Sequence, residues 1–437
     1  MSSVTDPSTT GFTEASLDAF LTPRGEPAWL VDRRRAAFAK YKSTPMPTLR
    51  DEEWRRTDIR ALKLDSFGPP NGATPDRSAV APTFDGLAAS YEAGIEQVDG
   101  STTMRADPSK LGGATFLDLA SAVERHPDLI KEYLLTKAVK DDADAFSALH
   151  AAFWTGGAVL YVPKGVKVEV PLFHLVGLSP AGRVDMSHTL VILEEGAEAT
   201  LIQETAGPGR SGPALHVGAV ELFVGRDAKL RFVNLQNWDA DTWHFSREKA
   251  VVDRGGAIQW TVGGLGARLA KVNQDVTLAG EGAHAQVNGV MFTTGKQHLA
   301  YYTRQDHAAP ATTSDLLYKG GLKGSSRTVW KGMIRVEKDA QKTNAYQKND
   351  SLILSDLARG DSIPGLEIEA NDVRCTHGAT AGPVDPEMVF YLQARGVGRE
   401  EAVRLIVEGF FANVYDRITL PPVQETLRRA VADKLNA

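Results

Sequence analysis

The spacing of apolar residues changes twice along the chain and divides it into three zones. In residues 1–155, apolar side chains recur every three or four positions, as on one face of a helix. Two helical stretches are predicted there, one following Pro27 and one over residues 116–149. Between them, residues 65–110 are rich in proline, glycine, serine and aspartate, which indicates a loop-rich linker. The first zone is therefore expected to be a helical region interrupted by this linker.

The middle zone, residues 156–380, has short apolar runs separated by glycines, which is the pattern of β-strands. No helical pattern interrupts it, and this excludes a doubly wound α/β sheet, because the parallel strands of such a sheet need crossover helices. A sandwich, a barrel and a β-solenoid all remain, since no strict sequence repeat selects the solenoid. The clearest strand patterns lie at residues 158–162, 166–170, 189–193 and 229–233.

The final zone, residues 381–437, returns to the helical period. Asp385 is a good N-cap for a helix with Pro386 in its first turn. A second helix is predicted over 400–414, and the proline pair at 421–422 opens a third. The chain is thus predicted to be mainly β, with helices at both ends.

Two adjacent aromatic residues, Phe410 and Phe411, lie on the predicted helix over 400–414. Neighbouring side chains on a helix diverge by about 100°. One ring can therefore enter the local core while the other reaches outward and anchors a binding partner. The alternative is that both rings are buried in a three-helix cluster with Leu392 and Leu427.

Length, composition and charge narrow the functional classes. The 437 residues, 42% of them hydrophobic and 24% charged, are typical of a globular protein with a large core. A net charge of -6 argues against nucleic-acid binding through phosphate contacts, which needs a basic surface. The N-terminus lacks the pattern of a secretory signal, and no run of 18 apolar residues could span a membrane. A cytoplasmic protein is expected.

Several motifs of catalysis are absent from the sequence. There is no Gly-x-x-x-x-Gly-Lys-Ser/Thr loop, so the chain is not itself a P-loop ATPase. There is also no Gly-x-Ser-x-Gly elbow and no His-Glu-x-x-His helix. No catalytic residues are assigned.

The chemically interesting pair is Cys375 and His377, separated by Thr376. On an extended strand, residues two apart face the same side at a spacing of about 6.6 Å. If the strand runs from Leu366, Glu369 and Asn371 share that face. Three interpretations are open: a thiolate nucleophile activated by histidine, half of a metal or cluster site, or a buried thiol beside a structural histidine. Iron–sulfur clusters usually take four protein ligands, so the cluster interpretation needs a second chain, because Cys375 is the only cysteine.

The segment around this pair closely resembles the signature of the SufB/SufD family, the scaffold subunits of the SufBCD iron–sulfur assembly machine. The single cysteine favours the SufD branch, because SufB-like paralogues are usually longer and richer in cysteine. In one departure, Asn371 stands where the family usually has aspartate, which removes one carboxylate near the site. The similar blocks extend over nearly the whole chain, at residues 50–55, 161–166, 307–314, 366–380, 390–397 and 408–411.

The resemblance implies a right-handed parallel β-helix core over residues 156–380, flanked by the helical regions 1–155 and 381–437. It implies a non-catalytic scaffold that pairs with a SufB-type subunit and binds a SufC-type ABC ATPase through the C-terminal helices. Cys375 and His377 then match the residues that hold a transient iron–sulfur cluster at the SufB–SufD interface. The isolated chain would hold no stable cluster and could form a homodimer.

Three other functions remain open. One is the role of a SufB-like scaffold. Another is a Cys/His-dependent enzyme built on a β-solenoid. A carbohydrate-active β-helix enzyme is the third, but it needs clustered acids on one face, and the sequence shows no such cluster.

Overall fold

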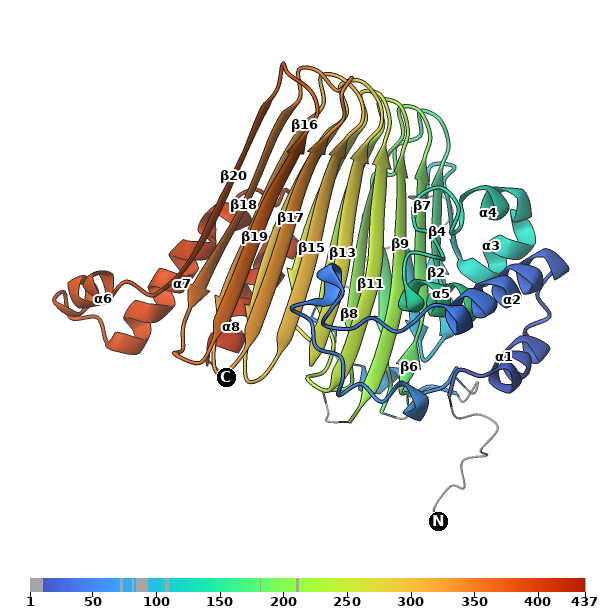
Figure 1. Cartoon of the computed structure of the whole chain (residues 1–437), viewed down its shortest axis with the longest axis horizontal. Helices are drawn as coiled ribbons and strands as arrows, with labels where there is room; N and C mark the ends of the chain where they lie inside the picture. The colour runs from blue at the N-terminus through green and yellow to red at the C-terminus, as the bar shows by residue number, and fades with distance from the viewer. Residues whose placement is uncertain are drawn as a thin grey trace, which may run out of the picture.

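A computed structural model describes residues 11–70, 74–80, 82–83, 93–106, 110–180, 182–209 and 212–436. Its body consists of two long sheets that face each other (Figure 1). From β4 onward, consecutive long strands fall alternately in the two sheets for most of the chain, and neighbouring strands within a sheet run parallel. This winding is a parallel β-solenoid with helices at both ends, so the predicted mainly-β fold with a β-helix core is confirmed.

The first sheet ends at the strand β20. In spatial order, its strands are β2 (Ser101–Ala106), β1 (Ala93–Val98), β5 (Leu172–Gly177), β8 (Glu198–Ala206), β10 (Lys229–Asn237), β12 (Ala257–Gly264), β14 (His284–Thr293), β16 (Thr313–Leu322), β18 (Asn344–Ile353) and β20 (Arg374–Pro383).

The second sheet ends at β19, on the same side of the molecule as β20. Its strands are β19 (Arg359–Ile368), β17 (Arg327–Val336), β15 (His298–His307), β13 (Leu269–Leu278), β11 (Thr242–Val252), β9 (Ala214–Val224), β7 (Ser187–Leu193), β4 (Gly156–Val162) and β3 (Thr115–Asp118), with the short β6 (Val184–Asp185) paired to β9.

Every second side chain points into the space between the sheets, and these side chains stack in rows along the solenoid. One row of the first sheet consists of Leu201, Phe232, Trp260, Val287 and Leu316, which are register neighbours on successive strands. All five are buried in the largest hydrophobic cluster. Each Å² of apolar surface buried in such a row stabilises the fold by about 25 cal/mol. The residues in a row need only be apolar, not identical. This explains a solenoid without a strict sequence repeat.

The N-terminal helices cover the outer face of the second sheet near β4, β7 and β9 (Figure 1). They are α1 (Glu14–Leu21), α2 (Ala28–Ser43), α3 (Leu119–Arg125), α4 (Pro127–Tyr133) and α5 (Ala145–Phe153), with 3-10 turns at Thr22–Arg24, Glu52–Trp54, Leu64–Ser66 and Arg77–Ala79.

Two expectations for this region need correction. The linker expected over 65–110 contains the strands β1 and β2, which extend the first sheet. The continuous helical stretch expected over 116–149 is instead a strand followed by three short helices. Here the tertiary packing against the solenoid outweighs the helical spacing of the leucines.

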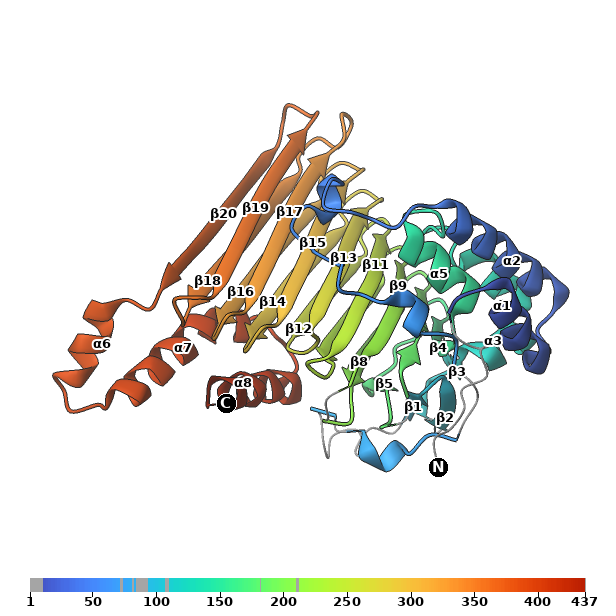
Figure 2. The same cartoon turned by 60° about the horizontal axis from the view of Figure 1, so that its bottom comes forward.

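The C-terminal helices are α6 (Pro386–Gln393), α7 (Arg399–Tyr415) and α8 (Pro421–Asn436), and their predicted starts are confirmed. The Asp385 side chain accepts a hydrogen bond from the backbone of Glu387 at 2.8 Å, so it caps α6 as expected. Helices α7 and α8 pack on the outer face of the first sheet. Figure 2 shows α6 projecting away from the sheets beyond the last strands.

Candidate functional site

The end of the solenoid formed by β19 and β20 is open. In the described part of the chain, β19 pairs only with β17 and β20 only with β18, so each strand keeps one free edge. Most residues of these two strands are exposed or half-buried, in contrast to the buried strands before them. Two apolar side chains of β19, Leu366 and Ile368, are 37% and 40% exposed at this end.

Cys375 and His377 both lie on β20, and both face the interior of the solenoid. Their register neighbours on β18 are Ala345 and Gln347, which are fully buried between the sheets. Paired positions of parallel strands face the same side, so the thiol and the imidazole point into the open last turn. The expectation that the two side chains share one face is confirmed.

The two side chains differ in their surroundings. Cys375 is half-buried and packs against an apolar cluster that contains Ile334, Val336 and Ala345. Burial raises the pKa of its thiol, which keeps it protonated at neutral pH. His377 is exposed at the mouth of the last turn. The pair therefore offers one accessible imidazole and one sheltered thiol.

Glu369 and Asn371 do not join this face, contrary to the expectation for a strand that runs from Leu366. The strand β19 ends at Ile368 and β20 begins at Arg374, so both residues lie in the turn between them. The Glu369 carboxylate lies 3.7 Å from the Arg335 guanidinium instead.

Two buried polar side chains of β18 lie behind the pair, and the sequence did not single them out. Gln347 donates hydrogen bonds from Nε2 to the carbonyls of Gly332 and Gly365, at 3.3 and 3.0 Å. Its Oε1 atom, like Nδ2 of Asn349, has no hydrogen-bond partner among the described residues. Gln347 occupies the next position in the interior row that includes Leu316, and His377 follows it. This row is therefore polar from β18 onward, one strand before His377. That Gln347 lies beside His377 can be recognised only when the register of β18 and β20 is known.

No group of three or more His, Cys, Asp or Glu side chains that could hold a metal ion occurs among the described residues. Cys375 and His377 supply two donors of types that iron accepts, a sulfur and an imidazole nitrogen. The arrangement can contribute to a cluster site but does not complete one.

An apolar groove lies between α6 and α7. Its lining includes Met388, Tyr391, Leu405 and Phe410. The side chains of Met388 and Tyr391 are 54% and 57% exposed, and the neighbouring Phe390 is 72% exposed. Exposed apolar side chains that line a groove are typical of a surface that binds another protein.

Phe410 and Phe411 have different environments. Phe411 is fully buried, with its ring near those of Phe292 and Tyr415. Phe410 is half-buried and lines the groove. A docking partner could therefore touch Phe410, whereas Phe411 belongs to the core that attaches α7 to the first sheet.

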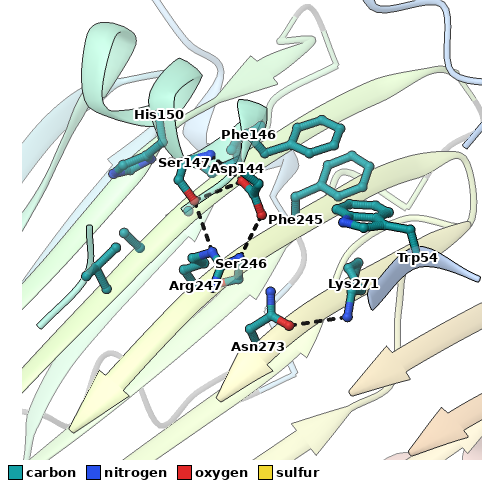
Figure 3. A pocket seen from close by; sticks show the side chains of 14 residues that line it. Trp54, Asp144, Phe146, Ser147, His150, Phe245, Ser246, Arg247, Lys271 and Asn273 are labelled. Carbon is teal, nitrogen blue, oxygen red and sulfur yellow. Dashed lines mark hydrogen bonds and ion pairs between the residues drawn. The ribbon is translucent and has the colours of Figure 1, made fainter. Parts of the chain in front are cut away.

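A second pocket, shown in Figure 3, lies between α5 and the outer face of the second sheet. Asp144 and Arg247 form an ion pair at 2.8 Å, and Lys271 donates a hydrogen bond to Asn273 at 3.2 Å. Burial lowers the pKa of Lys271 well below its usual value, and its ammonium group lies over the ring of Tyr302. The cavity measures about 20 Å³, which accommodates a single water molecule. These contacts attach the N-terminal region to the sheet and leave no room for a substrate.

The described residues thus form a parallel solenoid with a thiol and an imidazole at one open end, and an apolar groove between the C-terminal helices α6 and α7. Residues 21–173 match the SufBD protein N-terminal region, and residues 176–410 match the SufBD core domain of SUF system FeS cluster assembly. The chain belongs to the SufBD family and has a role in iron–sulfur cluster assembly.

Similar proteins cover almost all of the chain. The iron–sulfur cluster assembly protein SufD of Bacillus subtilis is 28% identical over 430 residues, which are 96% of this chain and 97% of that protein. An iron–sulfur cluster assembly SufBD family protein of Staphylococcus epidermidis is 29% identical over 417 residues, 92% of this chain and 88% of that protein. No helix of the described residues is long and apolar enough to cross a membrane.

Proposed function

We propose that the chain is a SufD-type scaffold subunit that has no catalytic turnover of its own. It pairs with a SufB-type subunit, binds a SufC-type ABC ATPase, and contributes Cys375 and His377 to a transient iron–sulfur cluster in the cytoplasm. The observation that carries this proposal is the position of both donors on the last strand, facing an open end of the solenoid.

The free edges support pairing with another solenoid. The edge strands β19 and β20 present unpaired backbone groups, which are a template for adding a strand from another chain. The partly exposed Leu366 and Ile368 lie at the same end and would be buried by such a partner. A second copy of this chain could occupy the end when no SufB-type subunit is present.

The number of donors supports a shared site. A cluster usually takes four protein ligands, and this end offers one thiol and one imidazole. The remaining ligands would come from the SufB-type subunit. The cluster is here the assembled product, which leaves for another protein.

The α6–α7 groove is the proposed docking site for the ATPase. It projects from the body of the protein and exposes large apolar and aromatic side chains, which are common anchors of protein interfaces. The sequence carries no P-loop, so the nucleotide would be bound by the partner.

The alternative of a Cys/His-dependent enzyme has less support. A nucleophilic cysteine needs a lowered thiol pKa, whereas burial raises that of Cys375. The environment of this thiol therefore favours the scaffold function.

The test compares His377→Ala with a control, His284→Ala, which removes an exposed histidine from β14. Each variant is purified with the SufB-type and SufC-type subunits, reconstituted anaerobically with iron and sulfide, and analysed for complex yield and cluster absorbance. We expect a normal yield of complex for both variants, but a severalfold lower cluster content for His377→Ala alone. Normal cluster content in the His377→Ala complex would refute the ligand role.

A further inference from the structure

A row of three polar residues crosses the outer face of the last strands of the first sheet. Lys319 on β16, Asp350 on β18 and Thr380 on β20 are register neighbours. The Thr380 hydroxyl donates a hydrogen bond to Oδ1 of Asp350 at 2.6 Å. The Asp350 Oδ2 atom lies 3.7 Å from Nζ of Lys319 and 3.0 Å from Nζ of Lys348.

The same row is attached to the helix α7. Nζ of Lys319 donates a hydrogen bond to the backbone carbonyl of Phe410 at 2.7 Å and lies 4.4 Å from the centre of the Phe410 ring. Phe410 lies inside α7 rather than at its end, so this lysine binds a carbonyl of the helix interior. The contact ties a particular turn of the helix to β16.

The Lys319 and Asp350 side chains of this row are buried, so their charges have little contact with water and depend on their protein partners. The side chains of Lys319 and Asp350 are each only 7% exposed. Removing the ammonium group of Lys319 leaves Asp350 paired only with Lys348, whose side chain is 35% exposed, so the buried carboxylate loses the more sheltered of its two cations. A change at Lys319 is therefore expected to affect the contacts of Asp350 and Thr380 as well.

Two separate connections join the helices to β20. The first is covalent, because β20 ends at Pro383 and α6 begins at Pro386. The second is the lateral row from Phe410 through Lys319 and Asp350 to Thr380. Thr380 lies three positions after His377 on the same strand and faces the opposite side, so the row reaches the strand that carries the donor pair and does not touch the pair itself.

We propose that Lys319 and Asp350 form a mechanical link between α7 and β20, so that binding at the α6–α7 groove changes the mobility of the strand that carries Cys375 and His377. The part of this inference that concerns binding rests on the proposed ATPase docking. Coupling of this kind is reciprocal, so a partner bound at the open end would also change the affinity of the groove.

The first test uses the full chain alone and measures amide hydrogen exchange by mass spectrometry. Lys319→Met retains the aliphatic stem of the side chain but removes the ammonium group. The matched control is Lys323→Met, because Lys323 on the same face donates a hydrogen bond to the Leu435 carbonyl of α8 at 2.8 Å. We expect Lys319→Met to accelerate exchange at least threefold in peptides from both α7 and β20. Lys323→Met should accelerate exchange in α8 and leave β20 unchanged.

A milder variant, Thr380→Val, removes only the last hydrogen bond of the row and is nearly isosteric. It should accelerate exchange in β20 and leave α7 unchanged. Faster exchange in α7 of Lys319→Met, with no change in β20 of either variant, would show that the row carries no mechanical connection.

The second test adds the SufC-type ATPase. If the unmodified chain does not bind it, the proposed docking fails and the link is judged by the first test alone. If it binds, we expect altered exchange in β20 of the unmodified chain. In Lys319→Met we expect a binding affinity within threefold and at least a halved response in β20. An undiminished response in β20 of that variant would overturn the proposal.

Discussion

At the scale of single residues, exposure distinguishes the two donors at the open end. His377 is exposed to any partner that covers the last turn, whereas Cys375 packs against apolar side chains of the last two turns. The histidine is thus the better candidate for a direct contact with a cluster. For the sheltered thiol, the structure instead predicts low reactivity before a partner binds.

The reactivity of Cys375 can be measured directly. Because burial raises its pKa above the usual value, less thiolate is present at neutral pH, and the thiolate is the reacting species. In the isolated chain we expect alkylation by iodoacetamide at pH 8 to be severalfold slower than for free cysteine, and equally fast after unfolding in urea. Intact mass spectrometry follows the single adduct. Alkylation faster than free cysteine would revive the interpretation as a nucleophile.

The shared face of this residue pair could be predicted from the sequence, because alternation along a strand is a local rule. The role of Gln347 could not, since it depends on which residue of the previous turn lies beside His377. The thiol pKa was equally inaccessible, because the apolar neighbours Ile334 and Val336 belong to β17, about 40 residues earlier in the chain.

At the scale of elements, the helix boundaries near the C-terminus were predictable and the winding of the strands was not. Proline and capping residues determine helix starts locally, as at Asp385 and Pro386. A solenoid instead depends on pairing between strands that lie about one turn apart in the chain, such as β10 with β12. The strands β1 and β2 were missed because the surrounding segment has the composition of a loop.

The C-terminal helices cannot be removed without damage to the solenoid. Phe411, Val414 and Leu427 are fully buried against the first sheet, so deletion of residues 385–437 would expose that sheet to water. Loss of ATPase binding in such a truncated chain would therefore be ambiguous. Point substitutions in the groove give a cleaner experiment.

We expect Met388→Ala together with Tyr391→Ala, two residues that line the groove, to weaken binding of the SufC-type ATPase at least tenfold. Both side chains are mostly exposed, so the substitutions should change the free energy of unfolding by less than about 0.5 kcal/mol. The control is Met104→Ala on β2, at the opposite end of the first sheet, where the side chain is 46% exposed. Calorimetric titration and thermal unfolding are measured for each variant. Unchanged affinity in the double variant would place the docking site elsewhere.

At the scale of the whole molecule, the interior of the solenoid combines an apolar core with uncharged polar groups and a few buried titratable ones. Glu248 on β11 is the clearest case, because its carboxyl group is buried without a cation. Its Oε1 atom accepts hydrogen bonds from Asn234 and Ser246, at 2.8 and 3.0 Å, and Oε2 has no partner among the described residues. A buried carboxyl in this setting favours its neutral form.

This carboxyl group predicts a particular dependence of stability on pH. Burial raises the pKa of Glu248 from 4.5 to about 7. The folded state therefore binds the proton more tightly than the unfolded state. The resulting stabilisation is fully present below pH 4.5 and is lost as the pH rises to about 7.

The buried histidines act in the opposite direction. Burial lowers the pKa of His150, His174 and His244 to about 3 each, from an ordinary value of 6.5. Their contribution to stability is present above pH 6.5 and is lost as the pH falls towards 3. Because the two effects overlap, the unmodified protein alone cannot reveal the effect of Glu248, and a difference between two proteins is needed.

Glu248→Gln removes the titration while retaining an acceptor for Asn234 and Ser246. A pKa raised from 4.5 to about 7 corresponds to a difference of about 3 kcal/mol between the two ends of that range. We therefore expect the free energy of unfolding of Glu248→Gln, relative to the unmodified chain, to rise by about 3 kcal/mol between pH 4.5 and pH 8. Urea unfolding followed by circular dichroism at several pH values gives this difference, and the histidine contributions cancel because both proteins contain them. A difference that stays constant with pH would mean that Glu248 titrates equally in the folded and unfolded states, with water or a cation reaching it inside the solenoid.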